Sequence, residues 1–217
     1  MLNIQNYIDD KQAREIILGS GPILLRIENF LDIQDIDDLY EYISGLKYKP
    51  YFHDISKKYI LDDVLEAIDT PKENPLNKWY NMVSDSDFFL HKIASLRNKQ
   101  RVAFIKQKSI NIHRYEEWDY HKRHVDNAAA KTVEALDDIG WGKFLGFHLS
   151  LTKWWKPWDG WELVFYLPNG EEIIYPPEYN TLWIYSASEL THEVKSITKW
   201  SKLTRFTLLN MYYGKIN

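Results

Sequence analysis

The sequence has no cysteine. Disulfides, thiolate metal sites and cysteine nucleophiles are therefore excluded, and the absence of cysteine favours a cytoplasmic location. An excess of positive charge is also missing, because 27 Lys and Arg residues stand against 31 Asp and Glu residues, which gives a formal net charge of -4. Since a nucleic-acid-binding domain usually shows a basic face or stripe, we expect no nucleic-acid partner.

Long apolar runs are absent as well. No stretch reaches the roughly 18 consecutive apolar residues of a membrane-spanning helix, so we expect no membrane partner. Residues 1–11 are polar and acidic, without the basic and apolar regions of a signal peptide. The 217 residues are nevertheless 45% hydrophobic, which is enough to bury one core, and we expect a single domain over residues 1–217. The sequence predicts no particular oligomeric state.

The pattern of apolar residues changes near residue 100. Before it, a short apolar run at 23–27 predicts a strand. Apolar side chains recur at three- and four-residue steps over 33–46, which predicts a helix. Three more helices are predicted at 61–68, 75–83 and 87–96. We therefore expect residues 1–100 to form a helical support layer with one early strand.

After residue 100 the chain shows short strand patterns separated by turn signals. Strands are predicted at 102–106, 109–115, 120–126, 144–152, 162–167, 171–175, 181–185, 192–194 and 203–213. Many short antiparallel strands that follow a helical layer predict an α+β fold. Its core would be a double-stranded β-helix (jelly roll) over 101–217, buttressed by the N-terminal helices.

The strongest chemical signal lies at the end of one predicted strand, where the chain reads Arg-His-Val-Asp. Residues two apart in a strand share a face, so His124 and Asp126 can point into the barrel together. By the same alternation, His121 is expected to face away from them. A lone H-x-D pattern also fits an ordinary hydrogen-bonded strand pair, so the metal interpretation depends on further residues.

Three downstream residues strengthen the metal interpretation. His192 can supply a third ligand, and two histidines with one carboxylate are the facial triad of non-haem Fe(II) oxygenases. Arg205 lies on the next predicted strand, and Thr207 shares its face. A buried guanidinium beside a hydroxyl suits one end of a dicarboxylate, because the guanidinium binds a carboxylate through two parallel hydrogen bonds.

These segments resemble, in order and spacing, the prolyl-4-hydroxylase-like group of 2-oxoglutarate oxygenases over residues 23–213. Residues 123–127 resemble the H-x-D strand of the animal oxygen-sensing prolyl hydroxylases. The sequence LTHEV at 190–194 resembles the segment that carries their distal histidine ligand. The sequence LSLTKW at 149–154 resembles their YLN-x-x-W strand, and residues 205–207 resemble their R-x-S/T co-substrate clamp.

The resemblance implies a cofactor set and a reaction. It implies that 2-oxoglutarate and O2 are used together with Fe(II), and that the iron ligands are His124, Asp126 and His192. It also implies that Arg205 holds the C5 carboxylate of 2-oxoglutarate, with Thr207 and Tyr115 adding hydrogen bonds. The expected reaction hydroxylates an unactivated C–H bond and releases succinate and CO2. These residues form the expected catalytic set.

The sequence departs from the family pattern at two places in the expected pocket. The usual tyrosine of the YLN strand is replaced by Leu149 or Ser150, so that His148 either lines the pocket or is a core histidine. Where the family has two glycines before a strand, this chain has Gly160 and Trp161. The departures alter the pocket around 2-oxoglutarate and the substrate.

Three functions therefore remain open on the sequence. The first is hydroxylation of a protein side chain, prolyl by the default of the resembled family. The second is hydroxylation of a free amino acid or another small biosynthetic metabolite. The third is a non-catalytic jelly-roll protein that binds a metal or a ligand. Residues 127–142, which follow the H-x-D pair, are long enough to form a lid over a small-molecule or peptidyl substrate.

Overall fold

The computed structural model describes residues 13–17, 22–62, 67, 74–84, 102–105, 110–126, 142–196 and 202–216. The predicted helix at 87–96 and all but the last residue of the predicted lid lie outside these ranges. Within the described ranges, no helix is long and apolar enough to cross a membrane.

The described elements are two helices and thirteen strands. The N-terminal part contains β1 (Ala13–Ile17), β2 (Ile23–Glu28), α2 (Ile33–Ser44), β3 (Tyr48–His53), β4 (Ser56–Leu61) and α4 (Pro75–Ser84). The rest contains β5 (Val102–Ile105), β6 (Ile110–Tyr115), β7 (Tyr120–His124), β8 (Gly142–Ser150), β9 (Leu163–Tyr166), β10 (Glu172–Tyr175), β11 (Thr181–Ser186), β12 (Thr191–Val194) and β13 (Arg205–Ile216).

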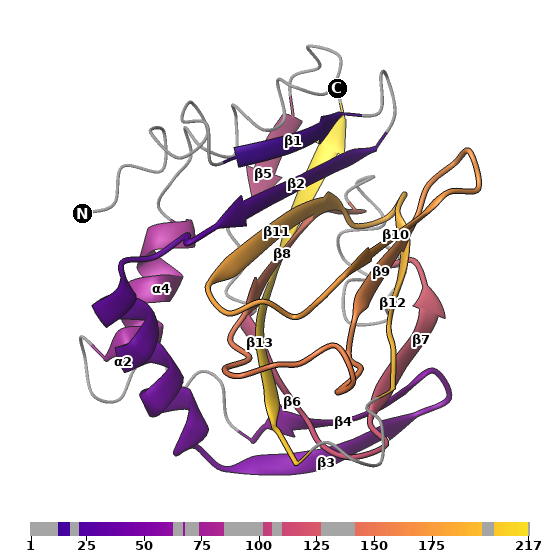
Figure 1. The fold of residues 1–217 in the computed structure, drawn as a ribbon. Coiled ribbons are helices and arrows are strands. Elements are labelled where there is room, and N and C mark those ends of the chain that lie inside the picture. Colours follow the sequence, from indigo (N-terminus) through magenta and orange to yellow (C-terminus); the bar gives the residue numbers. More distant parts are fainter. Residues whose placement is uncertain are drawn as a thin grey trace.

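The strands form a curled antiparallel sheet with two arms (Figure 1). One arm, here called the major sheet, has the order β1-β2-β11-β8-β13-β6, and the other, the minor sheet, has the order β7-β12-β9-β10. Strand β4 pairs with both β6 and β7 and so joins the arms. Sequence neighbours such as β7 and β8 lie in different arms, which is the pattern of a double-stranded β-helix. The predicted fold class is confirmed.

The outer face of the major sheet carries the larger hydrophobic core. Alternate residues of β8 (Leu145, Phe147 and Leu149) lie in this cluster, together with Leu208 of β13. They pack with the apolar sides of α2 and α4, which supply Ile36, Leu39, Ile43, Leu76, Trp79 and Val83. The period of two in the strands and the steps of three and four in the helices therefore meet at one interface.

Local sequence favours the end of α2 and the start of α4. Asp32 precedes α2, and Gly45 follows its last turn and donates its N–H to the carbonyl groups of that turn. Helix α4 begins at Pro75, where a missing N–H costs nothing, and the Asn74 side chain accepts the N–H of Asn77. The predicted helix at 75–83 thus matches α4 to within a residue.

The support layer differs from the prediction in its strand content. The sequence predicted one strand before residue 100, and the structure has four there, β1 to β4. The sequence did not predict the hairpin of β3 and β4. Within the described residues, β3 is an edge strand that pairs only with β4 and is mostly exposed, so it lacks the alternation of apolar and polar residues. The helix predicted at 61–68 is wrong at its start, because Leu61 ends β4.

Candidate active site

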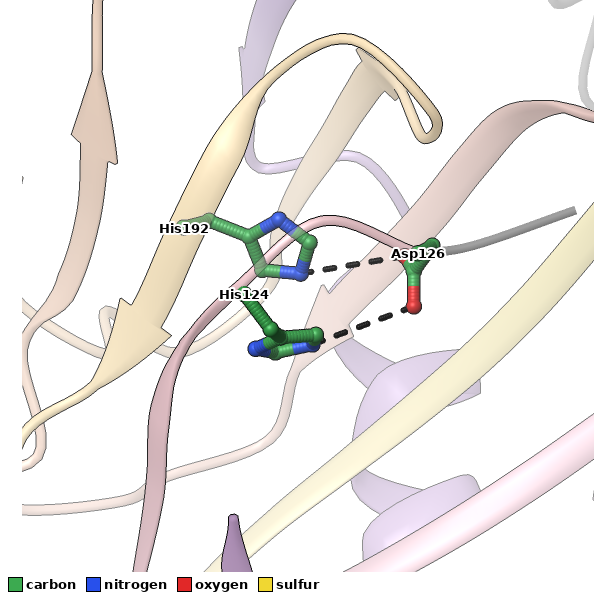
Figure 2. Close-up of side chains that lie close together, drawn as sticks. All are labelled: His124, Asp126 and His192. Atoms are coloured by element: carbon green, nitrogen blue, oxygen red, sulfur yellow. Dashed lines mark ion pairs between the residues drawn. The ribbon is translucent and has the colours of Figure 1, made fainter.

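The structure brings the three predicted metal ligands together at the inner edge of the minor sheet. His124 ends β7, Asp126 lies two residues beyond, and His192 on β12 is the register partner of His124. Figure 2 shows the three side chains converging, with the Nε2 atoms of both histidines turned toward the carboxylate. His124 Nε2 lies 3.8 Å from Asp126 Oδ1, and His192 Nε2 lies 3.7 Å from Asp126 Oδ2.

The geometry of the cluster suits a metal ion. One ligand atom from each residue lies within 4.8 Å of the others. Each histidine also has its Nδ1 next to a backbone carbonyl, at 2.7 Å from Lys122 for His124 and at 2.9 Å from Leu190 for His192. A neutral imidazole in this arrangement donates Nδ1–H to the carbonyl and keeps the Nε2 lone pair for a metal.

The charge state of His124 supports the same conclusion. Burial, followed by the neighbouring His192, lowers the pKa of His124 to about 4. The imidazole is therefore neutral at physiological pH, as a metal ligand must be.

Arg205 marks a second, deeper part of the site on the inner face of the major sheet. Its side chain is buried, and it makes no ion pair within the described residues. Nη1 donates to the Trp161 carbonyl at 2.7 Å, and Nη2 donates to His148 Nε2 at 3.2 Å. Burial lowers the pKa of Arg205 to about 10, so the guanidinium stays charged at neutral pH. A buried cation of this kind calls for an anion.

Unsatisfied polar atoms lie on the same strand and on its neighbour. Arg205 Nε, Thr207 Oγ1 and Ser150 Oγ are buried and have no hydrogen-bond partner in the described part of the chain. Thr207 is the register partner of Ser150, and Arg205 and Thr207 share the inner face of β13. Buried polar groups in native proteins are almost always paired, so these atoms point to a missing polar ligand.

Tyr115 and His113 complete the wall of this corner on β6. Tyr115 is the register partner of Arg205, and its ring centre lies 5.4 Å from the guanidinium carbon. The Tyr115 hydroxyl lies 3.5 Å from His113 Nδ1, which also faces Lys58 Nζ at 3.4 Å. Burial, followed by the Lys58 charge, lowers the pKa of His113 well below its ordinary value. The predicted co-substrate contact Tyr115 therefore lies beside Arg205.

His148 contacts Arg205, which decides between the two roles that the sequence left open for it. It lies on the inner face of β8, is buried, and accepts a hydrogen bond from Arg205. Burial, followed by the Arg205 charge, lowers the pKa of His148 well below its ordinary value, so the ring is neutral with its proton on Nδ1. Of the two residues that replace the family's tyrosine, Leu149 faces the outer core, whereas Ser150 pairs with Thr207.

The Gly160–Trp161 step explains how Arg205 is held. Both residues have a positive φ, 82° at Gly160 and 64° at Trp161, and such a backbone is strained for a residue with a large side chain. The carbonyl of Trp161 accepts the Arg205 Nη1 hydrogen bond, and its ring is fully buried. Trp154 and Trp158, in the same loop, are exposed.

His121 does not face away from the metal ligands, contrary to the prediction. Its ring stacks on that of His124, with ring centres 3.9 Å apart. The cause is a β-bulge: His192 pairs with His124 and Val194 with His121, so two steps on β12 oppose three on β7. An extra residue reverses the alternation, and sequence parity cannot reveal it.

Tyr185 is a site residue that the sequence analysis did not single out. It lies on β11, is buried, and donates its hydroxyl to Asp126 Oδ2 at 3.3 Å. Burial, followed by the Asp126 charge, raises the pKa of Tyr185 well above its ordinary value. Strand β11 contains a continuous apolar run and is buried at every residue, so no alternation marks its inward face, and no sequence signal links this tyrosine to Asp126.

Residues 110–213 match the model of the 2OG-Fe(II) oxygenase superfamily. The match spans the strands that carry the histidine and aspartate cluster and Arg205. The catalytic core is that of a 2OG-Fe(II) oxygenase. Such enzymes are dioxygenases that use Fe(II), 2-oxoglutarate and O2, and the cluster of two histidines and one aspartate has the residue types that hold their iron.

Solved structures of low sequence identity share the fold. A prolyl hydroxylase from Trichoplax adhaerens, solved in complex with a peptide fragment of hypoxia inducible factor, has a TM-score of 0.63 at 16% identity, covering 88% of this chain and 83% of that one. A prolyl-4-hydroxylase from Pseudomonas putida has a TM-score of 0.59 at 16% identity, covering 89% and 92%.

A third structure of the same fold is a non-haem alpha-ketoglutarate-dependent epimerase from nogalamycin biosynthesis. It has a TM-score of 0.58 at 8% identity, covering 88% of this oxygenase and 76% of that chain. No curated protein sequence matches this oxygenase.

Proposed function

We propose that this oxygenase hydroxylates a peptidyl side chain, prolyl by similarity to its structural neighbours, with release of succinate and CO2. The observation that carries the proposal is the pairing of two features in one barrel. Three ligand atoms lie within 4.8 Å of one another, and a buried arginine without an ion-pair partner in the described residues lies on the facing sheet. A metal and a dicarboxylate fit these two features together.

The metal-binding part of the proposal assigns a role to each ligand. His124 and His192 would coordinate Fe(II) through their Nε2 lone pairs, and Asp126 would supply the carboxylate oxygen. The three come from one side of the site, so the opposite side stays open. Bound Fe(II) supplies the oxidative chemistry that couples decarboxylation of 2-oxoglutarate to C–H hydroxylation.

The co-substrate part of the proposal follows from the orphaned polar atoms. Arg205 would bind the far carboxylate of 2-oxoglutarate, and Thr207 would donate its hydroxyl to the same group. The carbonyl of Trp161 and the Nε2 atom of His148 hold the guanidinium in place before the co-substrate arrives. Tyr115 would pack against the guanidinium and add its hydroxyl.

A free small molecule is the second candidate substrate. The similarity to the epimerase from nogalamycin biosynthesis supports it, because that protein belongs to a biosynthetic pathway. The similarity to the peptide-bound Trichoplax enzyme supports the peptidyl candidate. The two candidates differ in what must enter the site, and a direct screen separates them.

The iron assignment is tested by His192→Ala. We expect loss of measurable Fe(II)-dependent succinate formation, and a loss of affinity for Mn(II), a redox-silent replacement for Fe(II). A control is His53→Ala, which changes an exposed histidine in the hairpin and is expected to leave both unchanged. Wild-type metal affinity and turnover in the His192 variant would remove this residue from the metal centre.

The substrate is tested by stimulated succinate release. Wild-type protein with Fe(II) and 2-oxoglutarate is offered prolyl peptides, matched alanyl peptides, free amino acids and small metabolites. We expect slow turnover without substrate and stimulation by the prolyl peptides alone. Stimulation by free amino acids or metabolites instead would establish the second candidate. No succinate under any condition would leave a binding protein and contradict the proposal.

A further inference from the structure

Asp126 lies beyond the end of β7 and receives two contacts from one short segment of β11 and the turn that follows it. Its backbone N–H donates to the Ala187 carbonyl at 3.0 Å. Its Oδ2 atom accepts the Tyr185 hydroxyl at 3.3 Å. Tyr185 and Ala187 lie two residues apart in the chain, so the backbone and the side chain of Asp126 are held by the same short segment.

The Tyr185 ring is itself held tightly on three sides. It lies 4.9 Å from the His192 ring and 5.3 Å from the Phe165 ring, measured between centres. The third side is Gly146, its register partner on β8. A Cβ atom added there would lie 2.5 Å from Tyr185 Cζ and 2.8 Å from its hydroxyl oxygen.

Glycine is a poor strand residue, because it loses more backbone entropy on folding than other residues and packs no side chain. A glycine inside β8 therefore calls for a reason, and the close approach of the Tyr185 ring supplies one. Leu145 and Phe147, on either side, face the outer core and have ordinary strand side chains. Of these three positions, only the inward-facing one, residue 146, is a glycine.

The two oxygens of Asp126 are not equivalent in this arrangement. Oδ2 accepts the Tyr185 hydroxyl and lies 3.7 Å from His192 Nε2, whereas Oδ1 lies 3.8 Å from His124 Nε2. The Tyr185 hydrogen bond therefore favours one orientation of the carboxylate, in which each oxygen faces one imidazole. Hydrogen bonds from residues outside the ligand set commonly orient metal ligands in this way.

We propose that Tyr185 is a positioning residue that orients the Asp126 carboxylate toward the two imidazoles, and that Gly146 provides the space for its ring. The proposal rests on the proposed iron site and adds a residue outside the ligand set.

The test is the binding of redox-silent or spectroscopic metals to the full chain after its resident metal is removed. Tyr185→Phe keeps the ring and removes only the hydroxyl. We expect its Kd for Mn(II) to rise about tenfold or more, the range found for partners of metal ligands. We also expect the visible spectrum of the Co(II) form to change, which a purely structural role would not produce. The thermal midpoint of the metal-free protein is expected to stay near that of wild type.

The matched control is Tyr175→Phe, which removes a hydroxyl from another tyrosine of the same inner cluster. Tyr175 packs on Trp183 with ring centres 4.0 Å apart. The Tyr175→Phe variant is expected to keep wild-type Mn(II) affinity and an unchanged Co(II) spectrum. Gly146→Ala displaces the Tyr185 ring and is expected to weaken Mn(II) binding by a similar factor. A folded Gly146→Ala variant with wild-type Mn(II) affinity would overturn the role of Gly146.

The outcomes separate this proposal from the proposed function. Wild-type Mn(II) affinity and an unchanged Co(II) spectrum in Tyr185→Phe would overturn the positioning role and leave the iron site intact. Absence of Mn(II) and Co(II) binding in the wild-type protein, or binding that survives His124→Ala, would overturn the iron site and the positioning role with it.

Discussion

The two faces of the major sheet carry opposite kinds of side chain on the same strands. On β8, Leu145, Phe147 and Leu149 face outward, while Gly146, His148 and Ser150 face inward. Both faces are buried, so burial alone does not distinguish them. The outer face is apolar and packs on helices, whereas the inner face keeps polar atoms without partners in the described residues.

This difference separates folding from chemistry within one strand. The outer face gains stability from apolar burial, at roughly 25 cal/mol per Å2. The inner face gives up some stability by burying Arg205 and unpaired hydroxyls, a cost typical of sites that await a ligand. Substitutions on adjacent residues should therefore have different consequences, and four experiments test this difference between the two faces.

The largest effect is expected from Arg205→Ala on the inner face. The Kd for 2-oxoglutarate should rise by roughly 30-fold to 4,000-fold, on the order of 2–5 kcal/mol, because a desolvated carboxylate would lose its charged partner. Arg205→Lys should recover only part of this, since the two-pronged geometry is lost. Titration of the Mn(II)-loaded protein with 2-oxoglutarate measures the affinity of both variants. Unchanged affinity in the alanine variant would remove Arg205 from the co-substrate site.

The next effect is expected from Leu208→Ala on the outer face of the same strand. Leu208 is fully buried in the core beneath the helices. The free energy of unfolding should fall by about 3 kcal/mol, from lost burial and the remaining cavity. Denaturant unfolding measures this change, and the folded variant should keep wild-type affinity for 2-oxoglutarate. A large loss of affinity with little loss of stability would refute the separation of the faces.

A smaller effect is expected from His148→Phe. The variant removes the acceptor for Arg205 Nη2 but keeps a ring of similar shape. The Kd for 2-oxoglutarate should rise about tenfold, because the guanidinium loses one of its fixed contacts. Phe147→Leu, one residue away on the outer face, serves as the control and should lower stability only. Equal affinity in both variants would make His148 a packing residue.

The smallest effect is expected from pH. Burial lowers the pKa of both His113 and His148 well below the ordinary value, so the folded state binds fewer protons than the unfolded state below pH 6.5. The free energy of unfolding should therefore fall as the pH falls from 7 to 6, by up to about 1 kcal/mol for each histidine. His148→Phe should make the pH dependence shallower. Denaturant unfolding at the two pH values tests this, and a slope equal to that of wild type would contradict the neutral, buried state of His148.

The sequence predicted which pairs of site residues share a face, although Asp126 lies two residues beyond the end of β7. His124 and Asp126, Arg205 and Thr207 are pairs two residues apart, and the period of two was sufficient to place each pair on one face. The turn signals and short strands were sufficient to predict the jelly roll. These features are local, because strand alternation and turn chemistry act over a few residues.

The sequence did not predict contacts between segments that lie far apart in the chain. The bulge that turns His121 toward His124 depends on the register between β7 and β12. The β3–β4 hairpin that joins the two arms lies at an edge, where solvent exposure hides the strand pattern. The sequence did not decide which residue of β8 contacts Arg205, and the structure shows that His148 does.

The sequence alone is enough to predict the kind of chemistry, because it contains the ligand types, the charged clamp and the strand alternation that points them inward. How those groups are held depends on contacts between strands, through the Trp161 carbonyl on Arg205 and the Tyr185 hydroxyl on Asp126. Alternation is a property of a single strand and can be read locally. Hydrogen bonds between Arg205 and Trp161, or between Tyr185 and Asp126, exist only after the barrel has closed and brought separate strands together.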